Sequence, residues 1–481
     1  MAVRRRQTEG PEAHPLELGP AAMRQMVKLA MDRIVDHVRT LPEQPMHATA
    51  GGRKLAALLR EPLPDRGQPY ERLLRQLFGR IIPASLNTAS PGYLAYIPGG
   101  GIFHAAVADL IADAVNRYVG VWLAAPGLAQ IESNVVDWFR ALAGFPDEGG
   151  GVLTTGGSMA NLMAVITARR ERLPENFLSG VLYTSDQAHH SVAKAAMLAG
   201  FPSRNVRALP SDESFRIRVD ALEDAVASDR RAGLTPFMLV GSAGTTNTGA
   251  VDDLRALAEV AQREGLWFHV DAAYGGFFLL TERGRARMDG IERADSVTLD
   301  PHKGLFLPYG TGSLIVRDRE ALRRAHRVEA AYLPPSQTDP ELVDFADLSP
   351  ELSRDLRGLR IWLPFKMHGA GVFRDALDEK LSLAAELAME LGEMPELELV
   401  APPQLSLLAF RLRRPGLSDE ERDALGRRLM SAVNQRQRVL LTGTVTHGTF
   451  LIRVCVLSFR THRDRMQMCL EDIRHALKEI Q

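Results

Sequence analysis

Short, uninterrupted apolar runs alternate with helical patterns through the middle of this chain, and this alternation sets the fold class. The runs lie at residues 181–183, 237–240, 266–270 and 313–316. Helical periodicity covers residues 159–172 and 254–264 between them. The pattern is typical of an α/β fold with a mostly parallel sheet, mixed in part, covered by helices on both faces. Ligands bind at the carboxyl ends of such strands, so the residues after each run are the candidates for chemistry.

The chain divides into three predicted segments. Residues 1–95 contain an amphipathic helix at 21–38 but are too few to bury a core of their own, so they are expected to pack on a neighbour or a second subunit. Residues 96–380 are the predicted large α/β domain. Residues 381–481 are a predicted smaller α+β domain, with strands at 405–412 and 450–457 and helices at 419–433 and 464–480.

Composition excludes several classes of function. The 481 residues carry a net charge of −1, so we expect no nucleic-acid partner. No apolar run reaches membrane-spanning length, and the basic start, Met1 to Arg6, lacks the apolar stretch of a signal peptide, so we expect no membrane partner. Two cysteines, Cys455 and Cys469, can make neither a disulfide framework nor a cysteine-rich metal site, which fits a reducing cytoplasm and no metal.

Two of the strand ends carry glycine-bounded polar loops. Residues 154–161 place Gly157 and Ser158 at the start of a helix, where free backbone N–H groups can cradle a phosphate. The alternative is a turn with Ser158 as an ordinary helix cap. Residues 244–249 place Thr246 in a loop whose hydroxyls can bind a ligand or satisfy the turn backbone. The usual dinucleotide and nucleoside triphosphate fingerprints are absent from the sequence.

Three titratable residues follow other strands. His189 lies in residues 185–191, where it can stack on a flat ring or belong to a polar helix start. Asp271 lies within an apolar stretch, so its carboxylate needs a partner such as a protonated pyridine nitrogen or a structural ion pair. Lys303 follows a buried run in residues 298–304, where desolvation favours an amine that forms Schiff bases.

The order of these parts is more specific than any one of them. A phosphate loop, a stacking histidine, a buried aspartate and then a lysine are the parts that hold pyridoxal phosphate (PLP). In that arrangement the aspartate keeps the ring nitrogen protonated, and the ring becomes an electron sink.

From residue 20 to about 480 the sequence resembles the group II PLP-dependent decarboxylases, and the aromatic L-amino acid branch looks most similar. The resemblance is carried by residues 90–98, 185–189, 269–274 and 301–303, and by Arg453, Arg460 and Thr461. It implies a large domain of PLP-dependent transferase fold type I, a small C-terminal domain and an N-terminal segment that clasps a partner. It also implies an obligate homodimer with its sites at the interface.

The resemblance also implies residue roles. Lys303 forms the Schiff base with the cofactor, Asp271 pairs with the pyridine nitrogen, and His189 rather than His190 stacks on the ring. The phosphate side and ring edges are matched by Gly157, Ser158, His302, Thr246 and Ala273. The substrate rim is matched by Tyr96 and Pro98, with Gly99 opening a glycine run that loosens the pocket.

The implied reaction is decarboxylation of an L-amino acid to the amine and carbon dioxide, and an aromatic substrate is favoured. The family takes its final proton from a tyrosine on a mobile loop. Aligning residues 352–354 places Phe345 there, and relatives with phenylalanine tend to yield aldehyde, ammonia and peroxide. If the alignment slips by one residue, or if Tyr332 or His189 donates the proton instead, the product is again the amine. Two alternatives to an amine-forming decarboxylase stay open: a decarboxylating aldehyde synthase, and a protein that binds PLP without catalysis.

Overall fold

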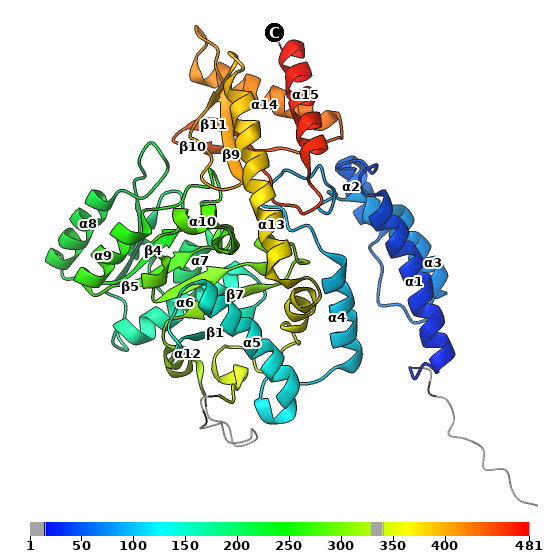
Figure 1. Ribbon diagram of the computed structural model, residues 1–481, viewed down its shortest axis with the longest axis horizontal. Helices are drawn as coiled ribbons and strands as arrows, with labels where there is room; N and C mark the ends of the chain where they lie inside the picture. The colour runs from blue at the N-terminus through cyan, green and yellow to red at the C-terminus, as the bar shows by residue number, and fades with distance from the viewer. Residues whose placement is uncertain (1–13, 15, 329–338, 340, 481) are drawn as a thin grey trace, which may run out of the picture. The chain divides into compact units, whose positions relative to one another are not determined.

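The computed structural model describes residues 14, 16–328, 339 and 341–480, which form two compact units within residues 1–87 and 88–481 (Figure 1). The described part of the first unit holds three α-helices, α1 (Pro20–Thr40), α2 (Gly52–Leu58) and α3 (Tyr70–Gln76). The helix expected at residues 21–38 is α1. None of its residues is fully buried, as expected for a segment without a core of its own.

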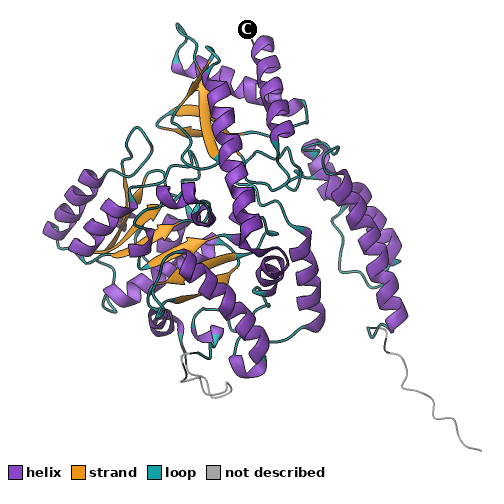
Figure 2. Cartoon of the chain, viewed as in Figure 1, coloured by secondary structure: helices purple, strands orange, loops and turns teal. Residues whose placement is uncertain are grey.

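The second unit is built on a seven-stranded mixed sheet with the order β1-β7-β6-β5-β4-β2-β3 (Figure 2). Its strands are β1 (Gly150–Thr154), β2 (Gly180–Ser185), β3 (Val206–Leu209), β4 (Thr235–Ser242), β5 (Trp267–Asp271), β6 (Ser296–Leu299) and β7 (Gly312–Val316). Only the pairs made by β7 are antiparallel. Every residue of β1, β2, β6 and β7 is buried, and because successive side chains point to opposite faces, both faces of the sheet are covered. The predicted α/β fold is confirmed.

The helices of this region are α4 (Phe103–Val115), α5 (Pro126–Leu142), α6 (Gly157–Arg172), α7 (Ser191–Leu198), α8 (Val219–Arg231), α9 (Leu254–Glu264), α10 (Glu282–Arg287), α11 (Pro301–Gly304) and α12 (Arg319–His326), and several of them cover the sheet. α6 crosses the sheet and contacts β1, β4, β5, β6 and β7, while α8 and α9 pack on β4. The first turn of α6 is thereby placed at the carboxyl ends of the parallel strands.

A second, four-stranded antiparallel sheet follows, with the order β10-β11-β9-β8. Its strands are β8 (Leu397–Leu399), β9 (Leu407–Leu412), β10 (Thr442–Thr446) and β11 (Thr449–Cys455), and its helices are α14 (Asp419–Gln435) and α15 (Arg463–Glu479). These elements have their own core, which includes Phe410, Leu429 and Ile473. The predicted small α+β region is confirmed.

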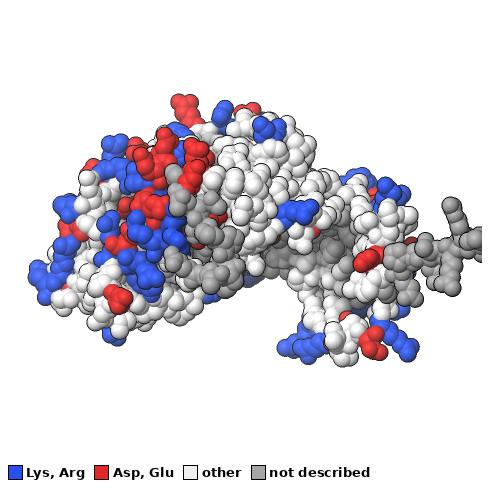
Figure 3. Space-filling view, turned by 90° about the horizontal axis from the view of Figure 1, so that it is seen from below, with Lys and Arg blue, Asp and Glu red and all other residues white. Residues whose placement is uncertain are grey.

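The long helix α13 (Leu359–Gly392) joins the two sheets and is interrupted at Gly369, whose φ is +72°. The predicted boundary between residues 380 and 381 falls inside this helix, and residues 88–95 belong to the second compact unit. Within the described residues, no helix has both the length and the apolar character that crossing a membrane requires. Figure 3 shows Lys and Arg side chains interspersed with Asp and Glu on one face, without a field of one sign.

Candidate active site

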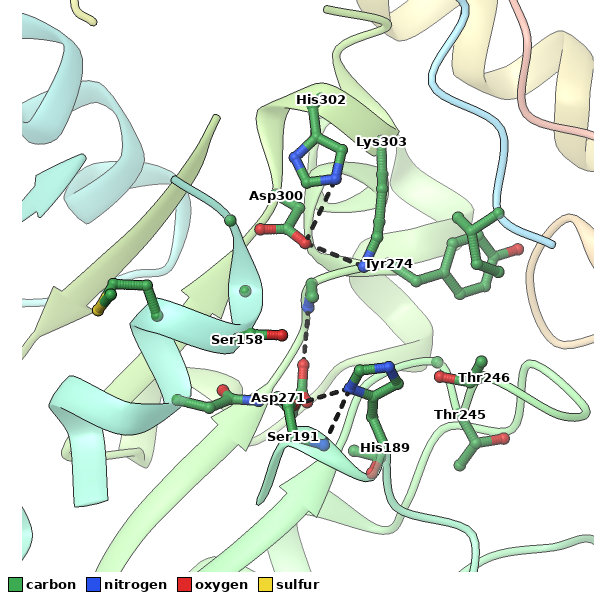
Figure 4. A pocket seen from close by; sticks show the side chains of 18 of the residues that line it. Ser158, His189, Ser191, Thr245, Thr246, Asp271, Tyr274, Asp300, His302 and Lys303 are labelled. Carbon is green, nitrogen blue, oxygen red and sulfur yellow. Dashed lines mark hydrogen bonds and ion pairs between the residues drawn. The ribbon is translucent and has the colours of Figure 1, made fainter. Parts of the chain in front are cut away.

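One cavity of about 300 Å³ lies where the connections after β1, β2, β4, β5 and β6 meet (Figure 4). These strands run in the same direction, so their carboxyl ends share one edge of the sheet. All eight residues predicted to contact the cofactor line this cavity: Gly157, Ser158, His189, Thr246, Asp271, Ala273, His302 and Lys303. Residues separated by more than 140 positions in the sequence are brought together by the sheet.

The loop after β1 forms one wall of the cavity. Gly156 has a φ of +147°, which favours glycine, and a Cβ on Gly157 would lie 2.9 Å from Oδ2 of Asp300. The amides of Gly157 and Ser158 begin α6, and within the described residues no acceptor takes their hydrogens. Free amides at the positive end of a sixteen-residue helix are suited to a phosphate group.

Asp271 ends β5 on another side of the cavity. Its Oδ2 accepts a hydrogen bond from Nδ2 of Asn161 at 2.9 Å, and its Oδ1 accepts one from the backbone N–H of Ala273 at 3.2 Å. Among the residues that the structure describes, no lysine, arginine or histidine forms an ion pair with Asp271. The alternative of a structural ion pair is therefore not observed among the described residues, and the carboxylate faces the cavity without a cationic partner.

His189 follows β2 and faces the same space, whereas His190 is exposed and does not line the cavity. Nδ1 of His189 lies 2.7 Å from Oγ of Ser191 and accepts a hydrogen bond from the backbone N–H of Ser191 at 3.3 Å. Burial lowers the pKa of His189, although the nearby Asp271 charge acts in the opposite direction. A neutral imidazole that accepts at Nδ1 can present its flat face to a planar ring.

Lys303 enters the cavity from α11, directly after β6, and its Nζ lies 2.9 Å from Oδ2 of Asp300 (Figure 4). Burial alone would lower the pKa of Lys303, but the charge of Asp300 and its hydrogen bond outweigh burial and raise it. The Asp300 side chain is only 2% exposed, so its charge is poorly screened. The amine is therefore held protonated, and it must lose a proton before it can attack a carbonyl.

Replacing Asp300 with Asn is expected to accelerate Schiff-base formation between Lys303 and added PLP at neutral pH. Without the counter-charge, the pKa of Lys303 falls, and each unit of that fall multiplies the neutral amine fraction about tenfold. The measurement is the rate at which the Schiff-base absorbance appears in cofactor-free protein, from neutral to alkaline pH. The gain should be largest at neutral pH and shrink as the pH rises. A variant rate equal to or below that of the unmodified protein at every pH would contradict this account.

Phe345 does not lie in the Lys303 cavity. It begins the 3-10 turn Phe345–Asp347, is 1% exposed, and has the guanidinium of Arg354 4.9 Å above its ring. It lines a different cavity, beside Arg140 and Arg319. Within the single chain, Phe345 is thus separate from the Lys303 cavity, and its expected role beside the reacting atoms stays a prediction. Tyr332, the other candidate on this segment, lies outside the described residues.

None of the three residues predicted for the substrate rim, Tyr96, Pro98 and Gly99, lines the cavity, although the neighbouring Ile97 does. Tyr96 is 56% exposed with a φ of +52°. Gly99 lies against the backbone of the lysine segment, where a Cβ would come within 2.6 Å of the carbonyl oxygen of His302.

Arg453 is buried and donates hydrogen bonds to the carbonyl oxygens of Thr246 and Asn247. This arrangement positions the loop that carries Thr246, in agreement with a structural role for Arg453. Asn161, Ser191 and Asp300 are among the cavity-lining residues that sequence reasoning did not assign. Asn161 lies four positions after Gly157, so helical spacing alone could have placed both on one face of α6.

The fold and this cavity define a PLP-dependent enzyme of fold type I. The free helix amides of the glycine loop fit the phosphate of PLP. The Asp271 carboxylate, which has no cationic partner among the described residues, fits the pyridine nitrogen, and the Lys303 amine fits the aldehyde. The model of the pyridoxal-dependent decarboxylase conserved domain matches residues 53–413. The chain belongs to the pyridoxal-dependent decarboxylase family.

Characterised relatives match along almost the whole chain. It is 35% identical over 467 residues to an aromatic-L-amino-acid decarboxylase of Bacillus atrophaeus, covering 97% of each chain. It is 30% identical over 453 residues to a phenylacetaldehyde synthase of Arabidopsis thaliana, covering 90% of this chain and 91% of the other. The crystal structure of Oryza sativa TDC with PLP and tryptamine superposes with a TM-score of 0.92 at 28% identity, covering 97% of this chain and 99% of the other.

Proposed function

We propose that this PLP-dependent decarboxylase acts on an aromatic L-amino acid and releases the corresponding amine and carbon dioxide. The observation that supports this most is the placement of the Lys303 amine and the free Asp271 carboxylate around one cavity. Of the competing functions, PLP binding without catalysis predicts that added amino acid shifts the cofactor absorbance without turnover. Release of carbon dioxide in proportion to enzyme would exclude that alternative.

In this proposal each residue around the cavity has a defined role. Lys303 holds the cofactor covalently, and its freed amine can carry a proton at Nζ. Asp271 holds a proton on the pyridine nitrogen, and neutral His189 packs against the ring. When bound, PLP withdraws the electron pair that remains on Cα after carbon dioxide leaves. The phosphate side is assigned to Gly157, Ser158 and His302, whose Nδ1 donates to the carbonyl oxygen of Thr311 at 2.5 Å, and the ring edges to Thr246 and Ala273.

The cavity offers little to an acidic substrate side chain. Among its described lining residues there is no arginine, and its one lysine is paired with Asp300. The tryptamine in the Oryza sativa structure supports an aromatic substrate. Carbon dioxide release should be measured for each standard amino acid. We expect turnover of tryptophan, tyrosine or phenylalanine and none of glutamate or aspartate; preferential turnover of glutamate would overturn the substrate assignment.

The position of Phe345 bears on whether the product is amine or aldehyde. Because its ring is buried against Arg354, outside the Lys303 cavity, Phe345→Tyr is expected to leave the products unchanged. Amine, aldehyde and peroxide should be quantified for the unmodified, Phe345→Tyr and Tyr332→Phe proteins. We expect amine without stoichiometric peroxide from the first two. Aldehyde and peroxide from the unmodified protein, converted to amine by Phe345→Tyr, would favour the aldehyde synthase.

A cytoplasmic homodimer is also part of the proposal. α1 keeps Met23, Met26, Val27 and Val35 exposed, as a surface that packs on a second subunit would. Cys455 and Cys469 are free and buried, in keeping with a reducing compartment. Light scattering of the full chain should give twice its 52.9 kDa mass, and a monomer at micromolar concentration would contradict the dimer.

A further inference from the structure

A series of hydrogen-bonded polar side chains runs from Asn161, which lines the cavity beside Asp271, to the buried residues behind it. Nε1 of Trp267 lies 2.8 Å from Oγ of Ser296, which lies 2.8 Å from Nδ1 of His269. Nε2 of His269 lies 3.1 Å from Oδ1 of Asn161. The Asn161 amide then reaches Oδ2 of Asp271 at 2.9 Å. Ser296, His269 and Asn161 are each no more than 2% exposed, so no solvent competes for these bonds.

The direction of every hydrogen bond in this chain is fixed from its two ends. The indole of Trp267 can only donate, and the carboxylate of Asp271 only accepts. The Nδ2 of Asn161 therefore faces Asp271, and its Oδ1 must accept from Nε2–H of His269. Nδ1 of His269 in turn accepts from the hydroxyl of Ser296. Thr298 donates a second hydrogen bond to Oδ1 of Asn161 at 2.8 Å, which fits the same orientation.

His269 stays neutral in this arrangement. Burial lowers the pKa of His269 to about 4, although the charge of Asp271 acts in the opposite direction. The neutral ring of His269 accepts a hydrogen bond at Nδ1 and donates one from Nε2, so it orients Asn161 without carrying a charge that would pair with Asp271. Donors thus point along the whole chain toward Asp271, which stabilises its charged form.

The same amide also reaches the histidine. Nδ2 of Asn161 donates to Oγ of Ser191 at 2.8 Å, and that hydroxyl lies 2.7 Å from Nδ1 of His189. Because the Ser191 hydroxyl accepts from Asn161, its own hydrogen is free for His189. One amide therefore orients the carboxylate and, through a hydroxyl, the imidazole of the cavity.

We infer that Asn161 and His269 are positioning residues that keep Asp271 ionised and aimed at the pyridine nitrogen while fixing the imidazole of His189. The inference rests on the proposed contact between Asp271 and that nitrogen. It does not depend on which amino acid is the substrate.

Asn161→Asp tests this inference because the side chain keeps its shape but replaces donors with acceptors. The introduced carboxyl would lie next to Asp271 and His269, both of which are on β5. It would also contact Ser191, which in turn contacts His189. When ionised it repels Asp271, and when protonated it can still donate. We expect PLP release about tenfold faster than from the unmodified holoenzyme at alkaline pH, with the difference shrinking as the pH falls. Absorbance of the bound cofactor gives the release rate without any turnover.

Control variants separate positioning from packing. Thr167→Val removes a buried hydroxyl of α6 that bonds the carbonyl of Met163 at 2.8 Å, away from the cavity, and should change thermal stability alone. His269→Phe should accelerate release, while His269→Gln, which keeps an N–H donor, should restore most of the retention. These two variants test the chain even if Asn161→Asp does not fold.

Asp271→Asn distinguishes failure of this inference from failure of the proposed function. Fast PLP release from Asp271→Asn with unchanged release from Asn161→Asp and His269→Phe at every pH would overturn the positioning role alone. Unchanged release from Asp271→Asn as well would overturn the proposed contact with the pyridine nitrogen.

Discussion

Lys303→Ala is expected to lower the turnover number for decarboxylation by on the order of a thousandfold or more. Lys303 is the only lysine that lines the cavity within the described residues, so no other amine there can form the Schiff base. The variant also loses an amine that can carry a proton beside the substrate. Single-turnover release of carbon dioxide at saturating PLP measures the effect.

Two controls accompany that measurement. Lys194→Ala removes an exposed lysine of α7 and should leave turnover unchanged. Lys303→Arg keeps a positive charge beside Asp300 but cannot form a Schiff base, so it should be as inactive as Lys303→Ala. Turnover by either Lys303 variant within tenfold of the unmodified enzyme would exclude Lys303 as the covalent anchor.

Glu132→Gln is expected to destabilise the second unit by about 3–5 kcal/mol. Glu132 in α5 forms an ion pair with Arg354 at 2.6 Å, and both side chains are fully buried. Glu132 also accepts a hydrogen bond from the backbone N–H of Gly358 at 3.1 Å, and Arg354 donates to the carbonyl oxygen of Leu153 at 3.1 Å. Neutralising Glu132 leaves the Arg354 charge buried without compensation, so the penalty is large.

Urea unfolding followed by fluorescence should measure the loss. Glu320→Gln is the matched control because the Glu320 side chain, which pairs with Arg323 at 3.1 Å, is 48% exposed, and pairs with a solvated partner contribute about 0–1 kcal/mol. Replacing Glu132 with Met and Arg354 with Leu together should recover most of the stability, since both charges are then removed. A loss below about 1 kcal/mol in Glu132→Gln would show that the pair is not the buried junction that its geometry indicates.

Sequence patterns predicted those parts of the fold that depend on local periodicity. The helix expected at residues 254–264 is α9, and the strand expected at 450–457 is β11, shifted by one or two residues. The cofactor-facing residues could be found for a related reason. Ser158, His189, Asp271 and Lys303 follow apolar runs, and the carboxyl ends of parallel strands share one edge, so their order along the chain was enough to group them. Ala273 and His302 were assigned only through the resemblance to the decarboxylases.

The remaining features depend on contacts that no local pattern encodes. Asp300 pairs with Lys303 at a local i,i+3 spacing across α11, but the near-complete burial of its side chain against the glycine loop after β1 depends on the fold. The register of β5 and β6, which pairs His269 with Ser296, builds the hydrogen-bond chain behind Asp271. Phe345 looks like any other apolar residue in the sequence, and its burial beneath the guanidinium of Arg354 is decided by packing. The continuity of α13 across residue 380 likewise follows from packing, because α13 contacts α4 and α5 as well as β8 and β9.

Borohydride reduction of the holoenzyme, followed by peptide mass mapping, tests the assignment of Lys303 most directly. Reduction converts a Schiff base into a stable bond, so the label marks the lysine that carried PLP. We predict a single phosphopyridoxyl group on Lys303, lost when a substrate amino acid is added before the reductant. A label on another lysine, or none on a protein with bound PLP, would contradict the assignment of Lys303 as the anchor.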